Sequence, residues 1–223
     1  MPQLTFQIEG AAALPYAAAP TIGFKLRIRQ RDDSDIRGVT LQCQVQIEST
    51  RRRYASEEQH RLFDLFGEPH RWSQTLRSML WTLVNTTVPS FRGETTVDLL
   101  VPCSFDFNVA ATKYFGSLKD GNVPLSFLFS GTVFYSPVPG QLQIEQIPWN
   151  HEAKFQLPVV VWQKMMEAYY PNEKWLAIRG DIFDRLVEYK RRRAIPTWDQ
   201  ALESLLSTAN HIDDRPLMAN KPS

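Results

Sequence analysis

The sequence lacks the residue patterns that usually mark a metal site or a catalytic centre. A zinc site needs three or four converging ligands, and no HxxxH or HxH spacing links the four histidines, His60, His70, His151 and His211. No GxGxxG or GxxxxGK motif occurs, so no phosphate-binding loop is predicted. Asp106 follows a predicted strand with no histidine nearby in the sequence, which favours an Asx turn over an acid or base. We therefore expect no catalytic residue, no metal and no cofactor.

Excess charge, a long apolar run and a signal peptide are also absent. The chain carries 25 Lys and Arg residues against 24 Asp and Glu, and a net charge of +1 gives no field that attracts nucleic acid or an anionic membrane. No apolar run approaches the ~20 residues that a membrane span needs. The N-terminal MPQLTFQIEG has neither the basic nor the apolar region of a signal peptide. These absences predict a cytoplasmic protein without a membrane partner, and they disfavour nucleic acid as a ligand.

Cysteine is scarce, which limits any role for disulfides. The two cysteines, Cys43 and Cys103, lie at core-facing positions of predicted strands. A free cysteine in a core behaves as a small hydrophobic residue, and a reducing cytoplasm disfavours a disulfide. We expect two buried, reduced thiols, with a disulfide or a redox role as the alternative.

Two stretches near the N-terminus alternate between apolar and polar residues with a period of two. The first runs from Ile22 to Ile28 and the second from Val39 to Ile47. Side chains of a strand point alternately to opposite faces, so each stretch presents one apolar and one polar face. Strands with one wet face are typical of antiparallel sheets. Because the charged turn RDDSD joins the two stretches, residues 21–49 are predicted to form a hairpin.

Further strands and short helices are expected along the chain. The motif Ser56-Glu57-Glu58-Gln59 is similar to a capping box, in which the Ser56 hydroxyl caps a helix and Gln59 reaches back. Residues 75–88 fit a helix or a strand; we favour a strand that forms a hairpin with strand 94–103, since Pro89 and Gly93 lie between them. The other expected elements are a strand at 3–8, the linker-like AAALPYAAAP, a helix at 109–118, and strands at 123–135, 141–147 and 153–157 with a turn at Pro137, Pro139 and Gly140.

After Pro158 the apolar spacing becomes helical. VVVWQKMMEAYYPN and residues 182–192 predict two amphipathic helices, separated by the short strand-like KWLAIRG. Pro196-Thr197-Trp198-Asp199-Gln200 opens a last helix with a second capping-box pattern. The fold is predicted to be α+β. It comprises an antiparallel β-sandwich-like domain with short inserted helices at 1–158, a C-terminal helical segment at 159–207 and a disordered tail at 208–223.

Five residues are candidates for binding another protein. Trp149 lies between Pro148 and Asn150 in a predicted loop, and tryptophan is enriched at interface hot spots; packing in the core or at its edge is the alternative. Phe134 belongs to strand 123–135, whose two apolar faces indicate either a central strand or part of an interface. The guanidinium groups of Arg51-Arg52-Arg53 are suited to an acidic partner or an anion. They also fit a solvated turn paired with Glu57 and Glu58.

Several phrases of the chain resemble a known bacterial family over roughly residues 20–207. They are LQCQVQIESTRRRY, DLFGEPHRW, VPCSFDFNVAATKYF, DGNVPLSFLFSGTVFY and IPWNHEAKFQLPVVVW. The family has no assigned function, and its genes often lie beside uptake nickel–iron hydrogenase genes and their maturation genes. The resemblance implies an accessory role in the assembly, chaperoning or docking of a metalloenzyme, and it implies a hydrogenase or maturation component as partner.

A second, local resemblance concerns the C-terminal segment. KWLAIRGDIFDRLVEYKRRRAIPTWDQALESLLS is similar to the strand–helix–helix core of ribbon-helix-helix antitoxins, with Leu186 at the first-helix leucine and Thr197–Asp199 at the second-helix cap. In that family, alternate polar strand residues read DNA bases. Here the corresponding sets are Trp175, Ala177 and Arg179, or Leu176, Ile178 and Gly180, and neither is a good base-reading trio.

The sequence therefore favours a non-enzymatic, cytoplasmic protein-binding or assembly module, an accessory factor for nickel–iron hydrogenase biogenesis by resemblance. A DNA-binding regulator that uses the C-terminal segment is the alternative. An enzyme whose residues converge only in three dimensions is a third hypothesis. The oligomeric state stays open.

Overall fold

The computed structural model of the chain describes residues 2–32, 34–104, 109–138, 141–173, 176 and 178–213, the side chains of 210–213 excepted. It divides into two compact units, Met1–Glu173 and Lys174–Ser223. The sequence predicted that the first domain ends at residue 158, whereas the first unit extends to Glu173 and includes one more helix. That helix, α5 (Val159–Tyr169), packs with the sheets: Val159 and Met165 are buried, and the Trp162 ring stacks on Phe115 at 5.5 Å.

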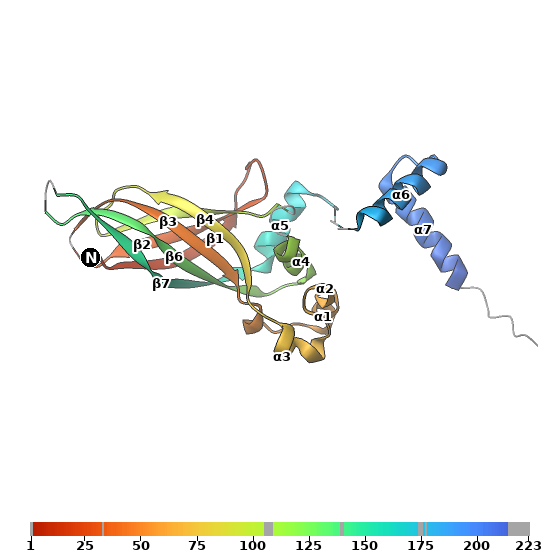
Figure 1. The fold of residues 1–223 in the computed structure, drawn as a ribbon, viewed down its shortest axis with the longest axis horizontal. Helices are drawn as coiled ribbons and strands as arrows, with labels where there is room; N and C mark the ends of the chain where they lie inside the picture. Colours follow the sequence, from red (N-terminus) through yellow and green to blue (C-terminus); the bar gives the residue numbers. More distant parts are fainter. Residues whose placement is uncertain are drawn as a thin grey trace, which may run out of the picture. The chain divides into compact units, whose positions relative to one another are not determined.

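The first unit is an antiparallel β-sandwich-like fold of two sheets, as predicted (Figure 1). One sheet has the order β1-β2-β5, with β1 Leu4–Ala13, β2 Thr21–Gln30 and β5 Glu94–Pro102. The other has the order β4-β3-β6-β7, with β4 Met79–Val88, β3 Asp35–Ile47, β6 Asn122–Ser136 and β7 Gln143–Pro158. All described pairings are antiparallel.

The core lies between the two sheets and is built from the alternating residues. The apolar positions of β2 and β3 are buried. Phe24 of the first sheet meets Phe127 of the second edge to face, with ring centroids 5.0 Å apart. Cys43 and Cys103 are buried and free, and burial raises the pKa of each thiol to about 12. The predicted apolar faces of these strands are thereby confirmed.

The predicted hairpins at 21–49 and 75–103 are wrong, although their strands exist. β2 pairs with β1 and β5, while β3 pairs with β4 and β6, so the RDDSD turn carries the chain from one sheet to the other. The Asp32 carboxylate fixes this turn by accepting from the backbone N–H groups of Gln3 and Ser34. β4 and β5 likewise belong to different sheets. Strand alternation fixes which face is buried but does not specify the neighbouring strand.

Other expected elements differ in extent. β1 continues to Ala13 and thus includes part of the linker-like stretch, and the strands expected at 141–147 and 153–157 form the single strand β7. The turn expected at Pro137, Pro139 and Gly140 joins β6 to β7, with Pro139 and Gly140 outside the described residues.

Short helices gather at one end of the sheets (Figure 1). They are α1 (Ser56–Arg61), α2 (Phe63–Phe66), α3 (Trp72–Thr75) and α4 (Val109–Ser117), with 3₁₀ turns at Ser49–Arg51 and Pro69–Arg71. The cap of α1 lies one residue earlier than predicted. Ala55 precedes the helix and donates its N–H to the Glu58 carboxylate at 3.1 Å, while Gln59 donates to the Tyr54 carbonyl.

The second unit contains two helices, α6 (Gly180–Arg192) and α7 (Trp198–Asp213). The predicted cap is confirmed, since Thr197 Oγ1 accepts from the Gln200 N–H at 3.3 Å. The strand expected at KWLAIRG is wrong for its described residues: 176, 178 and 179 form no strand, and Gly180 begins α6. The tail expected at 208–223 is helical to Asp213, and residues 214–223 lie outside the described part. None of the described helices is both long and apolar enough to cross a membrane.

Candidate protein-binding surface

Trp149 stands on an edge strand, where the sheet exposes it. β7 is the last strand of its sheet, and its pairing with β6 shifts register between Phe129 and Gly131, which makes residues 148–150 a bulge. Pro148 has no N–H to donate to a ladder, so it favours such an interruption. The Trp149 side chain is 84 % exposed. The structure thus places this residue in a strand rather than in a loop, and outside the core.

Further apolar side chains are exposed where β6 turns into β7. Ile144 is the cross-strand partner of Phe134, so the two share one face of the sheet. Leu142 and Ile144 are each 63 % exposed, Val138 is exposed and Phe134 is half-buried. We call these four residues together with Trp149 the β7 apolar surface. Exposed groups of large apolar residues on a soluble domain commonly mark interaction sites.

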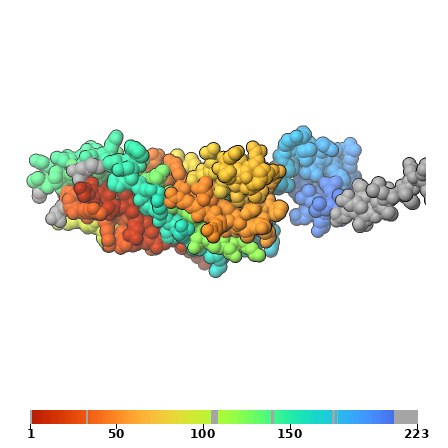
Figure 2. Space-filling view, turned by 90° about the horizontal axis from the view of Figure 1, so that it is seen from below, coloured from red at the N-terminus to blue at the C-terminus, as the bar shows by residue number. Residues whose placement is uncertain are grey.

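Val138, Leu142 and Ile144 lie by the β6–β7 turn, at the end of the first unit away from α1–α3, whereas Trp149 lies further along β7, between the pairs Gly131–Ile147 and Phe129–His151. Figure 2 shows this end in green and teal, and the helical end, in orange and yellow, at the opposite side of the unit. The bulge and Pro148 interrupt the free edge of β7, and such devices oppose pairing with a foreign strand. The exposed side chains, rather than the strand edge, are therefore the feature that this surface offers for binding.

Sequence reasoning singled out Trp149 and Phe134 but missed Leu142 and Ile144. Both were assigned to a meander strand, where an apolar residue is expected to face the core. The exposure of Ile144 follows from the β6–β7 register, which brings it beside the outward Phe134, while Leu142 precedes β7. A signal in the sequence is the loss of clean alternation in QLQIEQIPW, where no single apolar face persists.

The arginine run divides between the inside and the outside of the protein. Arg52 is largely buried, with 8 % of its side chain exposed, and pairs with Glu58 at 2.7 Å. Its guanidinium also donates to the carbonyl oxygens of Asp120 at 2.7 Å and Asn122 at 3.1 Å. Arg51 and Arg53 are exposed. Arg52 is therefore a structural residue that is inaccessible to a partner.

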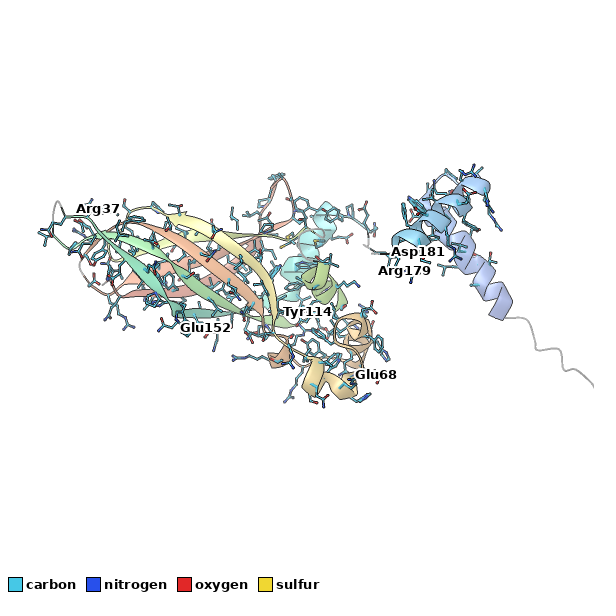
Figure 3. All side chains as sticks on the ribbon, in the orientation of Figure 1. Arg37, Glu68, Tyr114, Glu152, Arg179 and Asp181 are labelled. Atoms are coloured by element: carbon cyan, nitrogen blue, oxygen red, sulfur yellow. The ribbon has the colours of Figure 1, made fainter. Side chains whose placement is uncertain are left out.

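Two tyrosine hydroxyls lie beside this buried pair, at the helical end labelled by Tyr114 in Figure 3. Tyr54 Oη lies 2.8 Å from Tyr114 Oη and donates to the Ser49 carbonyl at 2.7 Å. Burial raises the pKa of Tyr54 to about 12 and raises that of Tyr114 further. Both phenols therefore stay protonated at neutral pH, where a general base needs a pKa near the working pH.

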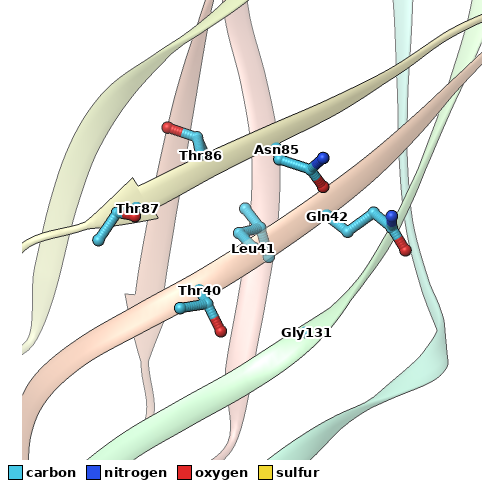
Figure 4. Close-up of a pocket in the computed structure, with 7 residues that line it drawn as sticks. All are labelled: Thr40, Leu41, Gln42, Asn85, Thr86, Thr87 and Gly131. Carbon is cyan, nitrogen blue, oxygen red and sulfur yellow. The ribbon is translucent and has the colours of Figure 1, made fainter.

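A shallow open hollow on the four-stranded sheet holds neutral groups alone (Figure 4). It is lined by Thr40, Leu41, Gln42, Asn85, Thr86, Thr87 and Gly131. None of these seven residues titrates near neutral pH, so the hollow offers hydrogen bonds but no acid, base or metal ligand.

The histidines do not converge on a described site. His60 and His70 are exposed, and His151 lies beside the Phe6 ring at 5.4 Å. No group of three His, Cys, Asp or Glu residues that could hold a metal occurs in the described part of the chain. Asp106 and the side chain of His211 lie outside that part. That the chain binds no metal stays a prediction.

Comparison with known proteins adds the relation of the chain to a family. The model of a family described as "Family of unknown function (DUF6084)" matches residues 1–214. A search of curated proteins finds no match.

Proposed function

We propose that this chain, which belongs to the family of unknown function DUF6084, acts by binding another protein through the β7 apolar surface. The observation that carries the proposal is the 84 % exposure of Trp149 on a strand that is otherwise part of a well-packed sheet. A tryptophan exposed to water on an ordered strand costs solvation free energy that a partner recovers by covering it. Large aromatic anchors of this kind dominate many protein interfaces.

The neighbouring side chains support a protein rather than a small polar ligand as the partner. Leu142, Ile144 and Val138 add apolar area near the same hairpin, and all three side chains stand exposed rather than enclosed. Small-molecule sites are usually concave and enclose most of the ligand. An exposed apolar group of this kind suits a partner that brings its own apolar surface.

We further propose that the partner is a component of nickel–iron hydrogenase or of its maturation machinery. The support is the resemblance of the chain to a family whose genes often lie beside uptake hydrogenase genes. In this role the chain binds a client or a maturation factor and changes no covalent bond.

The proposal is tested by isolating the tagged full-length chain from its native host while hydrogenase is being made. Trp149→Ala is compared with the wild type and with Tyr16→Ala as a matched control. Tyr16 is a fully exposed aromatic residue of the β1–β2 loop, and the Tyr169 hydroxyl ties that loop to α5 by donating to the Ala17 carbonyl at 2.7 Å. Co-purifying proteins are quantified by mass spectrometry.

We expect wild type and Tyr16→Ala to retain the same hydrogenase or maturation component and Trp149→Ala to lose it. With that component purified, Trp149→Ala should weaken binding by about 1–3 kcal/mol while the melting temperature stays close to that of the wild type. Equal retention by all three proteins would show that the β7 apolar surface is not the binding site. A retained partner unrelated to hydrogenase would keep the surface and overturn the proposed client.

A further inference from the structure

The second unit, which contains α6 and α7, exposes more apolar surface than two helices can cover by themselves. Ala201 is its one buried residue among those whose side chains are described. On the two helices, five large apolar residues are each at least 39 % exposed, and we call them the apolar hairpin face: Phe183 and Val187 on α6, and Trp198, Leu202 and Leu206 on α7.

Contacts between α6 and α7 hold this face in place. The rings of Phe183 and Trp198 lie 5.5 Å apart, and the hydroxyls of Tyr189 and Ser204 are 2.7 Å apart. Leu202 follows Trp198 by four residues and so lies on the same side of α7. The apolar side chains of both helices therefore meet along one edge of the unit rather than being scattered over it.

A unit of this size needs support from outside its own core. Helices of 13 and 16 residues bury too little area between them, and folded units below about 40 residues usually depend on disulfides, metals or association. Both cysteines of the chain, Cys43 and Cys103, lie in the first unit. No metal-binding cluster occurs in the described residues. The remaining means of covering the apolar hairpin face are the first unit of the same chain and association with another chain.

The charges on α6 select an antiparallel copy of the same helix. α6 begins with Asp181 and Asp184 and ends with Lys190, Arg191 and Arg192. A parallel copy would set like charges side by side, whereas an antiparallel copy brings the acidic start of each helix to the basic end of the other. Opposite charges across an interface fix its register and suppress wrong pairings.

Helical spacing identifies the residues at the centre of such a contact. Asp184 and Arg191 lie three residues before and four after the exposed Val187, so all three share one side of α6. Glu188 holds Arg191 in position through two hydrogen bonds of 2.9 Å. Among the described residues Asp184 makes no ion pair, unlike Asp181, which is bound by Arg179 as labelled in Figure 3.

We propose that a second copy of this chain covers the apolar hairpin face. The two α6 helices pack antiparallel about Val187, and Asp184 of each copy faces Arg191 of the other. The contact is isologous, so each pair of residues occurs twice and every favourable or repulsive change is doubled. This self-association is independent of the partner proposed for the β7 apolar surface.

The first test measures the mass of the full-length chain by light scattering and sedimentation over a range of concentrations. We expect the wild type to be a dimer and Val187→Glu to be a monomer, because the substitution puts two carboxylates at the two-fold centre. Val160→Glu on α5, another exposed valine, is the matched control and should stay a dimer. A wild-type monomer at every concentration, or an unchanged dimer in Val187→Glu, would overturn the proposal.

The second test exchanges charges and tests the facing residues directly. Asp184→Arg and Arg191→Asp should each weaken self-association by about tenfold or more, since like charges then face each other twice. An equal mixture of the two variants should form a heterodimer, because every facing pair is again Arg with Asp. If the single variants were monomeric because they were misfolded, mixing them would not restore a dimer. Circular dichroism checks that each variant keeps its helix content.

If both single variants dimerise like the wild type, or if mixing fails to restore a dimer, the antiparallel pairing is wrong. A monomeric wild type whose apolar hairpin face is protected from solvent labelling would instead identify the first unit of the same chain as its cover.

Discussion

At the scale of single residues, the buried Arg52–Glu58 pair connects two separate backbone segments, 52–58 and 119–122. Arg52 donates to the turn at 120–122, and Glu58 accepts from the N–H groups of Lys119 at 2.9 Å and Ala55 at 3.1 Å. A buried charge is costly unless it is paired and hydrogen-bonded. The pair therefore fixes the start of α1 against the turn that leads into β6.

Glu58→Gln is expected to destabilise the protein strongly. The amide keeps the size of the side chain but leaves the Arg52 charge buried without a counter-charge, which typically costs about 3–5 kcal/mol. Urea unfolding followed by fluorescence measures the loss. Glu57→Gln is the matched control, since Glu57 makes an exposed i,i+4 pair with Arg61 that is worth at most about 1 kcal/mol. Similar losses in both variants would contradict the structural role of Glu58.

The sequence could place Arg51, Arg52 and Arg53 in a turn but could not show which of them is buried. Pairing with a nearby glutamate was one of the two interpretations, and it holds for Arg52. Its burial depends on the carbonyl groups of Asp120 and Asn122, which are far away along the chain. Contacts of this kind leave no periodic signal in the sequence. The two tyrosine hydroxyls at 2.8 Å are another contact that only the fold reveals.

At the scale of elements, the sequence predicted the strands better than their partners. Period-two alternation identified the buried faces of β2, β3 and β5 because burial acts on each strand separately. The partner of a strand depends instead on contacts across the whole sheet, and here β2 and β3 are consecutive but belong to different sheets. The same reason explains why Trp149 could be proposed as exposed while the exposure of Ile144 was missed.

β6 contains a position that accepts only glycine. Gly131 has a φ of +146° at the register shift, and a Cβ there would overlap the carbonyl oxygen of Thr40 on β3. Gly131→Ala should therefore force β6 away from β3 and lower the free energy of unfolding by about 3 kcal/mol or more.

Gly10→Ala provides the comparison, because a Cβ at this β1 position meets nothing within 4 Å. Chemical unfolding of both variants measures the difference. If Gly131→Ala proves as stable as Gly10→Ala, the backbone of β6 at Gly131 does not approach the Thr40 carbonyl of β3 this closely in solution.

At the scale of the whole molecule, the change from period-two to helical apolar spacing indicated a β-rich chain with a helical C-terminus, but the spacing of α5 could not show which unit it joins. Its apolar residues fit an amphipathic helix that packs on either part. Val159 and Met165 are buried, and α5 covers the ends of β1, β2 and β7. Burial of one helix against three strands decides the boundary, and such long-range packing has no local signature.

The boundary leads to a prediction about truncated chains. A chain ending at Glu173 should keep the fold of the first unit and melt within a few degrees of the full-length protein, because α5 remains. A chain ending at Pro158 loses Val159, Trp162 and Met165, and removing large buried side chains costs about 2–5 kcal/mol each. That sum is comparable to the ~5–15 kcal/mol that stabilises a domain, so this chain should fail to fold cooperatively.

Thermal unfolding followed by circular dichroism distinguishes the two truncated chains. The chain ending at Glu173 also separates the two proposals, since it keeps Trp149 and lacks α6 and α7. It should bind the partner of the β7 apolar surface with the intrinsic affinity of one site and should be a monomer at concentrations where the full-length chain is a dimer. If it dimerises as the full-length chain does, self-association belongs to the first unit and not to α6 and α7. If it folds but loses the partner, binding requires the second unit, and the β7 apolar surface is not sufficient.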